Sequence, residues 1–386
     1  MRLLKTAVIA ICGIFASVAI VCANAVPLKE HSAVNAYPML SANGAEIGEF
    51  SPADIFKGKK SLLTLSLASD ERRLVPLGMP FGIKLYTEGV IVVGFTDIQT
   101  ENGDKNPCYE AGIRKGDVII SVDGEKVSSN ENLAGLVELS NGKALNVAYK
   151  RNGALYNVDV YPVKQKDGIF KLGIWIRDSA AGVGTVSFVD PKTGSFGGLG
   201  HGICDVDTLK LMPLGKASVY EASVDSVIAG KKGSPGELCA HFSSNTPWGD
   251  IYINSSYGVY GKLNGDFSSY KSYPIASYDE IRSGPATVIT SVSGSTPKEY
   301  SVFIEKISPN SNGEKNFLIR ISDESLLEIS NGIVQGMSGS PLIQNGKIIG
   351  AVTHVLVNDP HKGYGIFIEN MLKVSKDSEK IAQSFN

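Results

Sequence analysis

After residue 164 the chain is a succession of short apolar runs separated by turn residues. The runs include "GVGTVSFVD", "DIYIN", "ATVITSV", "EYSVFIEKIS" and "NFLIRISD". Many short runs between regular turns are typical of an all-β barrel or sandwich. The 42 glycines and 17 prolines of the chain fit this pattern, because both residues punctuate short strands. We therefore expect a mainly β chain, with weak helical signals in this part near "DESLLEIS" and near the C-terminus.

The bulk composition sets only broad limits on function. With 386 residues the chain is long enough for two or three domains. A formal net charge of -2 gives no electrostatic case for a nucleic-acid partner. No Cys-x-x-Cys or His-Glu-x-x-His spacing predicts a metal site. Cys108, Cys204 and Cys239 are too few for a disulfide framework in a chain of this length.

The N-terminus carries an export signature. Arg2 and Lys5 precede an uncharged, mostly apolar segment that ends at Leu28. A basic start followed by an apolar segment is typical of a signal peptide, and "ANA" at residues 23–25 offers a cleavage site. The segment also approaches the roughly 20 residues that span a bilayer. Residues 1–26 are therefore expected to be a signal peptide or a membrane anchor, with the rest of the chain outside the cytoplasm.

Residues 74–163 show a sharper pattern of strands and turns, after a linker expected over residues 27–73. The run "GVIVVGF" is bounded by glycines, and "AGIRKGDVIISVDGEKV" indicates a turn, a strand, a second turn and a short strand. A helix is expected from an N-cap at Asn130 to Gly142. The "RNG" at residues 151–153 then predicts a hairpin.

This segment resembles a PDZ domain of the type found in bacterial exported proteases, most specifically in "EAGIRKGDVIISVDGEKV". In such a domain an extended peptide pairs with a strand edge, and backbone N–H groups bind its terminal carboxylate. The stretch "MPFGIKL" looks like the carboxylate-binding loop, which assigns Phe81, Gly82 and Ile83 to the peptide. The alternative is a plain turn that leads into a strand.

A serine between glycines marks the candidate active site. Ser338 lies in "GMSGSP", and two apolar runs separated by "QNGK" follow it as an expected hairpin. A serine nucleophile needs a base that accepts its proton and donors for the developing oxyanion. Gly336 permits unusual backbone angles, so the N–H groups of Gly336 and Ser338 can converge on one point. Turns of glycine and serine are also often only structural.

The expected base is a histidine. His201 lies on a second glycine-rich turn, "GGLGHGICD", where its side chain can project into a cleft. His354, in the strand after the nucleophile turn, is its main rival. An isolated histidine is more often structural than catalytic, because catalysis requires partners in space.

The two motifs "GLGHGICD" and "GIVQGMSGSPLIQNGKIIGAVTHVLVNDPHKGYGIFIENML" closely resemble the stage IV sporulation protein B peptidases, the S55 serine peptidases. The PDZ segment and the N-terminal apolar segment match as well, so the resemblance covers nearly the whole chain. It implies a serine endopeptidase domain over residues 164–386 with a chymotrypsin-like double β-barrel. It further implies Ser338 as nucleophile, His201 as general base, and no cofactor.

The acid of the triad stays open. The resemblance implies Asp323, in "IRISDESLLEIS", as the carboxylate that orients His201. The usual chain order of chymotrypsin-like enzymes instead favours an acid well before the nucleophile turn, at Asp225 or Asp250. Spacing along the sequence does not show which of them contacts His201.

The resemblance also implies substrates and partners. The strand edge at Val352, Thr353 and His354 is expected to pair with the substrate backbone. The enzyme is expected between forespore and mother cell, where it cleaves itself near its N-terminus. It then cleaves a membrane-bound regulator and so triggers processing of the sigma factor K precursor. The PDZ domain is expected to bind a chain end of the target or its own N-terminal region.

Two alternative functions remain beside this one. The first is a non-catalytic PDZ scaffold whose barrel has lost activity. The second is a general envelope quality-control protease, a class of oligomers with broad specificity.

Overall fold

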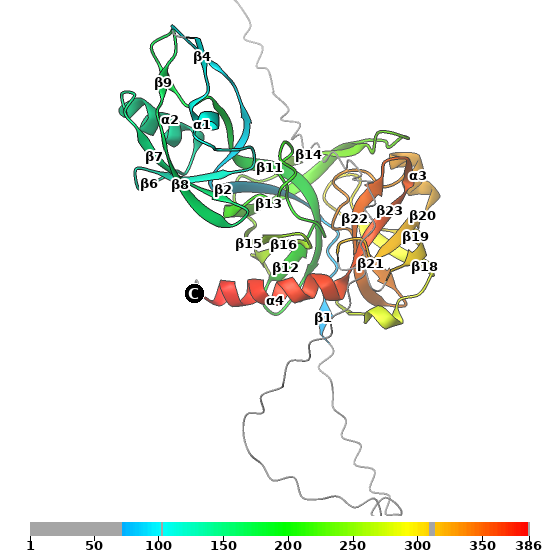
Figure 1. Cartoon of the computed structure of the whole chain (residues 1–386). Helices are drawn as coiled ribbons and strands as arrows, with labels where there is room; N and C mark the ends of the chain where they lie inside the picture. Colours follow the sequence, from blue (N-terminus) through cyan, green and yellow to red (C-terminus); the bar gives the residue numbers. More distant parts are fainter. Residues whose placement is uncertain (1–71, 102, 309–312, 385–386) are drawn as a thin grey trace, which may run out of the picture. The chain divides into compact units, whose positions relative to one another are not determined.

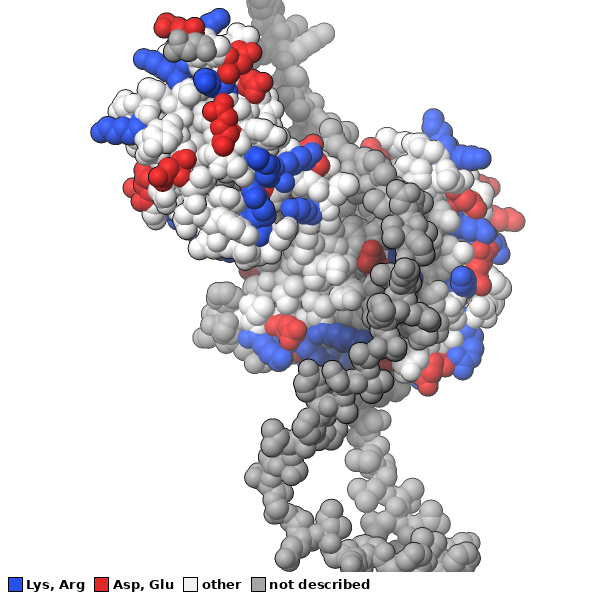
Figure 2. Space-filling model, in the orientation of Figure 1, with Lys and Arg blue, Asp and Glu red and all other residues white. Residues whose placement is uncertain are grey.

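The structure, a computed structural model, describes residues 72–101, 103–308 and 313–384 (Figure 1). The expected signal peptide or anchor lies outside these residues, as does nearly all of the expected linker. Strands dominate the described residues, which confirms the prediction of a mainly β chain. No helix in this part of the chain is both long and apolar enough to cross a membrane. On the face in Figure 2 basic and acidic side chains are interspersed.

Six strands close on one another into a ring, here called the first barrel. Antiparallel pairing runs from β2 to β13, β15, β16, β12, β11 and back to β2. Apolar side chains such as Phe81, Phe196 and Val219 fill its interior. The strands of the ring are β2 (Pro80–Phe95), β11 (Ile174–Val189), β12 (Ser195–Gly198), β13 (Leu214–Ile228), β15 (Gly249–Ser255) and β16 (Gly258–Leu263). β14 (Glu237–Phe242) extends β13 outside the ring.

Two strands of the first barrel, β2 and β11, are each 16 residues long and continue into the PDZ domain (Figure 1). There β2 pairs with β5, and β5 pairs with β7 and β7 with β8. A separate apolar core lies beneath α2. The elements of this domain are β3 (Ile98–Thr100), β4 (Gly103–Lys105), α1 (Pro107–Glu110), β5 (Val118–Val122), β6 (Glu125–Lys126), α2 (Asn130–Leu139), β7 (Leu145–Arg151), β8 (Ala154–Val160), β9 (Val163–Lys164) and β10 (Phe170–Lys171).

The predicted local features of the PDZ segment are largely confirmed. Asn152 and Gly153 form the hairpin turn between β7 and β8 with φ of 50° and 84°. Both angles are positive, as a two-residue hairpin turn of the mirror-image type requires. The helix is α2, but its N-cap is Ser129, whose side chain accepts the N–H of Asn132, and not Asn130.

The PDZ domain was predicted over residues 74–163, but the strand pairing gives it different bounds. Residues 80–87 belong to the wall of the first barrel, and Val75 and Leu77 belong to its core. At the other end, Ile174–Arg177 complete the PDZ sheet. β2 runs without a break from one body into the other, and the boundary is only a register shift near Gly89 (φ 77°). The PDZ domain is thus inserted into the first barrel.

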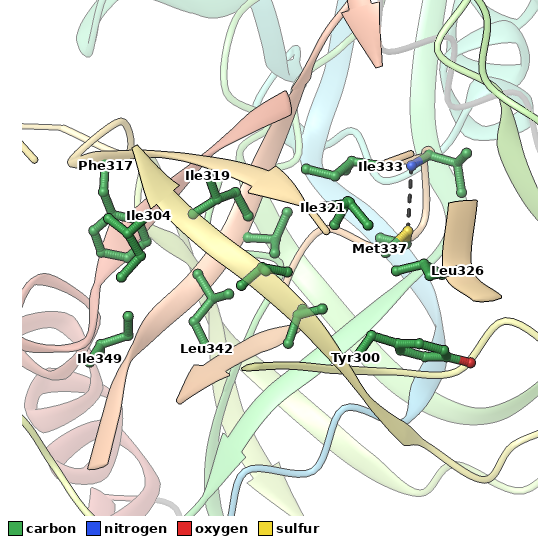
Figure 3. Packing of buried hydrophobic residues seen from close by; sticks show 14 of the residues in the cluster. Tyr300, Ile304, Phe317, Ile319, Ile321, Leu326, Ile333, Met337, Leu342 and Ile349 are labelled. Carbon is green, nitrogen blue, oxygen red and sulfur yellow. Dashed lines mark hydrogen bonds between the residues drawn. The ribbon is translucent and has the colours of Figure 1, made fainter. Parts of the chain in front are cut away.

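A second closed barrel follows, with the pairing order β18, β19, β20, β23, β22 and β21. Its interior is a continuous apolar cluster (Figure 3). The predicted hairpin at "QNGK" is confirmed between β21 and β22, with positive φ at Asn345 and Gly346. The strands are β18 (Gly284–Thr290), β19 (Lys298–Ile307), β20 (Phe317–Ile321), β21 (Pro341–Gln344), β22 (Lys347–Leu356) and β23 (Asp359–Phe367).

The remaining elements join the two barrels. β1 (Arg73–Leu74) pairs with β17 (Tyr273–Pro274), and η2 (Tyr278–Glu280) leads into β18. Helix α3 (Glu324–Ser330) precedes the nucleophile turn, and helix α4 (Ile368–Ser384) packs on strands of both barrels. Met371 and Leu372 of α4 share an apolar cluster with Phe188 and Tyr260 of the first barrel. Both predicted helices of this part are therefore present.

Candidate active site

The nucleophile turn lies between α3 and β21 and is anchored in the second barrel. Gly336 and Gly339 have φ of 94° and 98°, angles that L side chains rarely adopt. Met337, between Gly336 and Ser338, is fully buried, and its Sδ accepts the N–H of Val334 at 3.4 Å (Figure 3). The buried methionine fixes the turn from the core side, whereas Ser338 stays partly exposed.

A single residue of the first barrel, Thr185 on β11, clamps this turn. Its N–H donates to the Ser338 carbonyl at 3.0 Å, and its Oγ1 donates to the Gly336 carbonyl at 2.8 Å. The N–H groups of Gly336 and Ser338 have no hydrogen-bond acceptor among the described residues. The clamp therefore fixes two carbonyls and leaves the two N–H groups available to an oxyanion.

Thr185 also holds the start of the histidine turn. Its carbonyl accepts the N–H of Leu199 at 3.2 Å, directly before Gly200 and His201. Gly339 packs so closely at this point that a Cβ on it would lie 1.9 Å from the Thr185 carbonyl oxygen. The nucleophile turn and the histidine turn are thus fixed side by side on one strand.

His201 is in the neutral form that a general base needs. Burial lowers the pKa of its imidazole, although the Gly202 carbonyl and the charge of Glu314 act in the opposite direction. Its Nδ1 lies 3.0 Å from the Gly202 carbonyl oxygen. The His354 ring lies beside it, with ring centroids 5.1 Å apart. Burial, with the charges of His201 and Lys315, lowers the pKa of His354 to about 3.

Ser338 and His201 are not hydrogen-bonded to each other in the described structure. Ser338 Oγ instead donates to the carbonyl of Thr353 on β22 at 2.8 Å. Gly200 nevertheless brings the histidine turn against β22, because a Cβ on it would lie 2.8 Å from Thr353 Cγ2. The turns of Ser338 and His201 therefore both lie against Thr353 of β22, and the Ser338 hydroxyl is turned toward that strand.

The predicted substrate edge on β22 is only partly free. Val352 uses both backbone groups on the nucleophile turn, as its N–H donates to Ser340 and its carbonyl accepts from Gly339. The Thr353 carbonyl, in contrast, faces Ser338, and the buried Nδ1 of His354 has no hydrogen-bond partner among the described residues. Val352 therefore supports the turn, and the Thr353 carbonyl binds the Ser338 hydroxyl.

Asp323 is not brought to His201. It is the N-cap of α3, where Oδ1 accepts the N–H of Leu326 at 3.2 Å and Oδ2 accepts the N–H of Ser301 at 3.1 Å. These hydrogen bonds to Ser325, Ser301 and the start of the helix lower the pKa of Asp323. A carboxylate that caps a helix serves local structure. The expectation that Asp323 orients His201 is therefore corrected for this arrangement.

The rival aspartates are occupied elsewhere as well. Asp250 accepts from Ser218 Oγ at 3.2 Å within the first barrel. Asp225 lies 2.9 Å from Nδ1 of His241 on the exposed β13–β14 hairpin. Neither contacts His201, so the chain order of chymotrypsin-like enzymes does not supply the acid here.

One carboxylate that acts on His201 was not predicted from the sequence, Glu314. It precedes β20, and its charge raises the pKa of His201 and also that of Cys204. Its backbone carbonyl accepts from Thr353 Oγ1 at 2.9 Å, which ties it to the strand that holds Ser338. Nothing in the polar stretch "NSNGEKN" distinguishes this residue along the sequence, since only the fold brings it to the site.

The predicted carboxylate loop of the PDZ domain is not a loop. Phe81, Gly82 and Ile83 lie in β2, where β11 pairs with one side and β13 with the other. Phe81 and Ile83 are buried in the first barrel, and a Cβ on Gly82 would collide with the Phe242 ring. Their backbone groups are used in the barrel, so the expectation that they bind a peptide is corrected.

A different strand edge of the PDZ domain is open. Between Ile174 and Arg177, β11 pairs only with β2 among the described strands. Helix α2 lies next to this edge, with the N–H of Asn130 donating to Asp178 Oδ2 at 3.0 Å. Leu136 of α2 and Ile174 are half-buried against the same core. A strand edge beside an apolar helix face is where an extended peptide binds by strand addition.

Comparison with known proteins agrees with this architecture. Residues 168–372, more than half of the chain, match the family described as SpoIVB peptidase S55, and residues 83–161 match a PDZ domain. The chain belongs to the SpoIVB peptidase S55 family. The family match thus assigns a peptidase domain to the two barrels and a PDZ domain to the segment inserted in the first of them.

Two curated relatives cover smaller parts of the chain. "Putative zinc metalloprotease LL2128" of Lactococcus lactis is 34% identical over 98 residues, 25% of this chain and 21% of the relative. "Putative zinc metalloprotease CA_C1796" of Clostridium acetobutylicum is 25% identical over 190 residues, 46% of this chain and 52% of the relative. The chain thus spans about half or less of either relative. Within its described residues, no group of three or more His, Cys, Asp or Glu side chains is placed to hold a metal ion.

Solved structures resemble parts of the chain at low identity. The PDZ domain of the SdrC-like protein of Listeria monocytogenes has 20% identity and a TM-score of 0.19, covering 23% of this chain and 87% of that one. The inactive protease Rv3671c of M. tuberculosis has 14% identity and a TM-score of 0.28, covering 50% and 81%. The HtrA-type protease AlgW with a decapeptide has 13% identity and a TM-score of 0.29, covering 53% and 55%.

The capping role of Asp323 predicts a separation of stability from catalysis. Asp323→Ala should lower the free energy of unfolding by about 1 kcal/mol, because α3 loses its N-cap, whereas Asp323→Asn should keep it, because asparagine caps equally well. Denaturant unfolding measures both variants. If Asp323→Asn is fully stable but loses most of its kcat, Asp323 acts in catalysis after all, because an asparagine replaces the helix cap but not the charge of a catalytic acid.

The environment of His201 predicts the pH dependence of activity. A base must be unprotonated, and its lowered pKa should put the acid limb of kcat/KM below the ordinary histidine value of about 6.5. Glu314→Gln removes a charge that raises this pKa, so the limb should move to still lower pH. The pH profiles of both proteins test this. An acid limb above 6.5, or one that Glu314→Gln moves upward, contradicts it.

The Thr185 clamp predicts a requirement for one hydroxyl. Thr185→Val keeps the shape of the side chain but leaves the Gly336 carbonyl without its donor, which should cost about 1–3 kcal/mol of stability and lower kcat. Thr185→Ser retains the hydroxyl and is the matched control. Unfolding curves and kcat measure the two effects. Equal activity of the Val and Ser variants would show that the clamp does not fix the turn.

Proposed function

We propose that this peptidase uses Ser338 as its nucleophile and His201 as its general base. The observation that carries the proposal is the Thr185 clamp, which fixes both turns on one strand and leaves the N–H groups of Gly336 and Ser338 free for an oxyanion. A neutral imidazole beside such a turn has the form needed to accept the serine proton. The two-barrel architecture, with histidine before serine along the chain, supports a chymotrypsin-like reaction.

The resting hydrogen bond of Ser338 indicates how catalysis begins. The Thr353 carbonyl, which now accepts from Ser338 Oγ, is also the acceptor that an extended substrate meets on β22. When a substrate N–H donates a hydrogen bond to this carbonyl, it displaces the Ser338 hydroxyl, which then turns to His201. Ser338 Oγ attacks the scissile carbonyl while its proton passes to the imidazole, and the imidazolium later protonates the leaving amine. Substrate binding would in this way assemble the catalytic pair.

Two groups act on His201 in the place of a triad acid. In the described arrangement the Gly202 carbonyl orients His201, and Glu314 is the carboxylate whose charge acts on it. A carbonyl in this place still fixes the tautomer, because it requires a proton on Nδ1 and leaves Nε2 to accept. A negative charge nearby stabilises the imidazolium that forms in the reaction.

The family supports a role in sporulation. We propose an exported enzyme between forespore and mother cell, anchored by or released from its N-terminal segment. It would cleave itself near the N-terminus and then cut a membrane-bound regulator, so that the sigma factor K precursor is processed. The PDZ domain would bind a chain end of the target or its own N-terminal region along the open edge of β11.

Intact-mass analysis of the purified chain tests the catalytic assignment. Residues 27–386 should shorten at a defined N-terminal bond, whereas Ser338→Ala and His201→Ala should remain whole, since loss of either partner lowers the rate by several orders of magnitude, about 10⁴ or more. Shortening of all three proteins alike would point to a contaminating protease. If all three stay whole and also leave a peptide library uncut, a PDZ scaffold without activity explains the chain better.

A further inference from the structure

Strand β11 carries the PDZ sheet at one end and contacts the nucleophile turn at the other. Its first residues, from Ile174 to Arg177, pair with the PDZ half of β2. Further along the same strand, Thr185 binds the carbonyls of Gly336 and Ser338. Arg177 is therefore the residue at which the strand passes from one body into the other.

The Arg177 guanidinium binds two carboxylates on the loop that follows His201. Nη1 pairs with Asp205 Oδ2, and Nη2 donates to Asp207 Oδ2 at 2.7 Å. Asp205 is 1% exposed, whereas Arg177 is 30% exposed. No other cation among the described residues forms an ion pair with Asp205. A buried carboxylate that loses its partner is strongly destabilising, so Arg177 is what keeps Asp205 in place.

Asp205 in turn shapes the histidine loop. Its Oδ1 accepts the N–H of Thr208 at 2.7 Å and that of Asp207 at 3.2 Å. The backbone closes around it, with the N–H of Asp205 donating to Lys210 at 2.9 Å and that of Met212 to Ile203 at 2.9 Å. The loop that carries the chain away from His201 is thus built around the carboxylate that Arg177 holds.

On the PDZ side, the residue next to Arg177 contacts α2. Asp178 Oδ2 accepts the N–H of Asn130, the first residue of α2, and the Asp178 carbonyl accepts from Thr87 Oγ1 at 3.0 Å. Leu136 of α2 packs in the same apolar core as Ile176, directly before Arg177. A shift of α2 against β11 therefore acts on the immediate neighbours of Arg177.

We propose that Arg177 is a positioning residue of the peptidase that couples the PDZ domain to the loop carrying His201. The proposal rests on the proposed role of His201 as the base. The pair between Arg177 and Asp205 holds the loop so that His201 lies against His354 and within reach of Ser338. A peptide that enters between α2 and β11 shifts Arg177 and changes the fraction of molecules with a competent His201.

The rate of covalent labelling by a fluorophosphonate tests the positioning role, because this probe needs no knowledge of the peptide specificity. Ser338 Oγ forms the bond to phosphorus, fluoride leaves, and the serine proton passes to His201. Arg177→Gln and Asp205→Asn should label more slowly by on the order of tenfold to 100-fold, as expected when a reacting group is displaced by about 1 Å.

A matched control separates position from stability. Arg320 forms a similar, partly exposed pair with Glu305 at 2.9 Å in the second barrel, and Arg320→Gln should label at the wild-type rate. A purely structural role of Arg177 would lower only the final fraction of labelled protein and leave the rate constant of the folded molecules unchanged. That result, or equal rates for Arg177→Gln and wild type, overturns the proposal.

A double-mutant cycle tests the coupling to the PDZ domain. Leu136→Gln alters the α2 face next to β11, and it should change the labelling rate when Arg177 is present but not in the Arg177→Gln background. Leu155→Gln, on the exposed face of β8, controls for changes elsewhere on the domain. Equal effects of Leu136→Gln in both backgrounds would show that Arg177 does not transmit the change.

Hydrogen exchange provides a readout that does not depend on activity. The amides of Thr208 and Met212 should exchange faster in Arg177→Gln than in wild type or Arg320→Gln, because the loop loses its anchor. Unchanged protection contradicts the positioning role. If wild type resists the fluorophosphonate as fully as Ser338→Ala, the proposed function fails, and the exchange result alone decides whether Arg177 positions the loop.

Discussion

The arrangement of the site depends on one strand that serves three bodies at once. β11 completes the PDZ sheet, closes the first barrel, and binds the nucleophile turn of the second barrel through Thr185. Each of these contacts uses backbone groups or a buried side chain, so the strand has little freedom to move at one end without the other. The relative placement of the turns that carry Ser338 and His201 is thus set by backbone pairing together with the Thr185 hydroxyl.

The resting hydrogen bond between Ser338 and Thr353 fits an enzyme whose activity is conditional. A hydroxyl that donates to a backbone carbonyl is satisfied and has no base to accept its proton. Displacing it costs only the difference between two hydrogen bonds, which is small on the scale of substrate binding. The restraint lies in the direction of the hydroxyl, because a neutral imidazole can accept the serine proton only after the hydroxyl turns toward it.

Much of the fold could be predicted from the sequence, because turn residues and apolar periodicity are local signals. The hairpins at Asn152-Gly153 and Asn345-Gly346 and the helices α2, α3 and α4 were of this kind. The insertion of the PDZ domain could not be predicted, since β2 and β11 are each one continuous strand although two different cores bury their two ends.

Some residues of the candidate site could likewise be predicted from local sequence signals, and others could not. Ser338 and His201 stand in glycine-rich turns that a sequence displays, and the structure places these turns together. Phe81 and Asp323 were predicted as site residues from their neighbours along the chain. Long-range strand pairing buries Phe81 in the first barrel, and Asp323 caps α3 through a local contact with Leu326. Glu314 and Arg177 carry no local signal, since only the closure of the barrels brings them to His201 and Asp205.

The insertion also determines the order in which the chain can fold during synthesis. β2 leaves the ribosome long before its barrel partner β11, and the elements β3 to β10 of the PDZ domain lie between them. Left to itself, so long a loop would close slowly, because the entropy of bringing its ends together must be lost first. A PDZ domain that folds on emergence brings those ends together as neighbouring strands and turns a distant pairing into a local one. The inserted domain would then act as an internal folding aid for the barrel that surrounds its termini, before it ever meets a peptide.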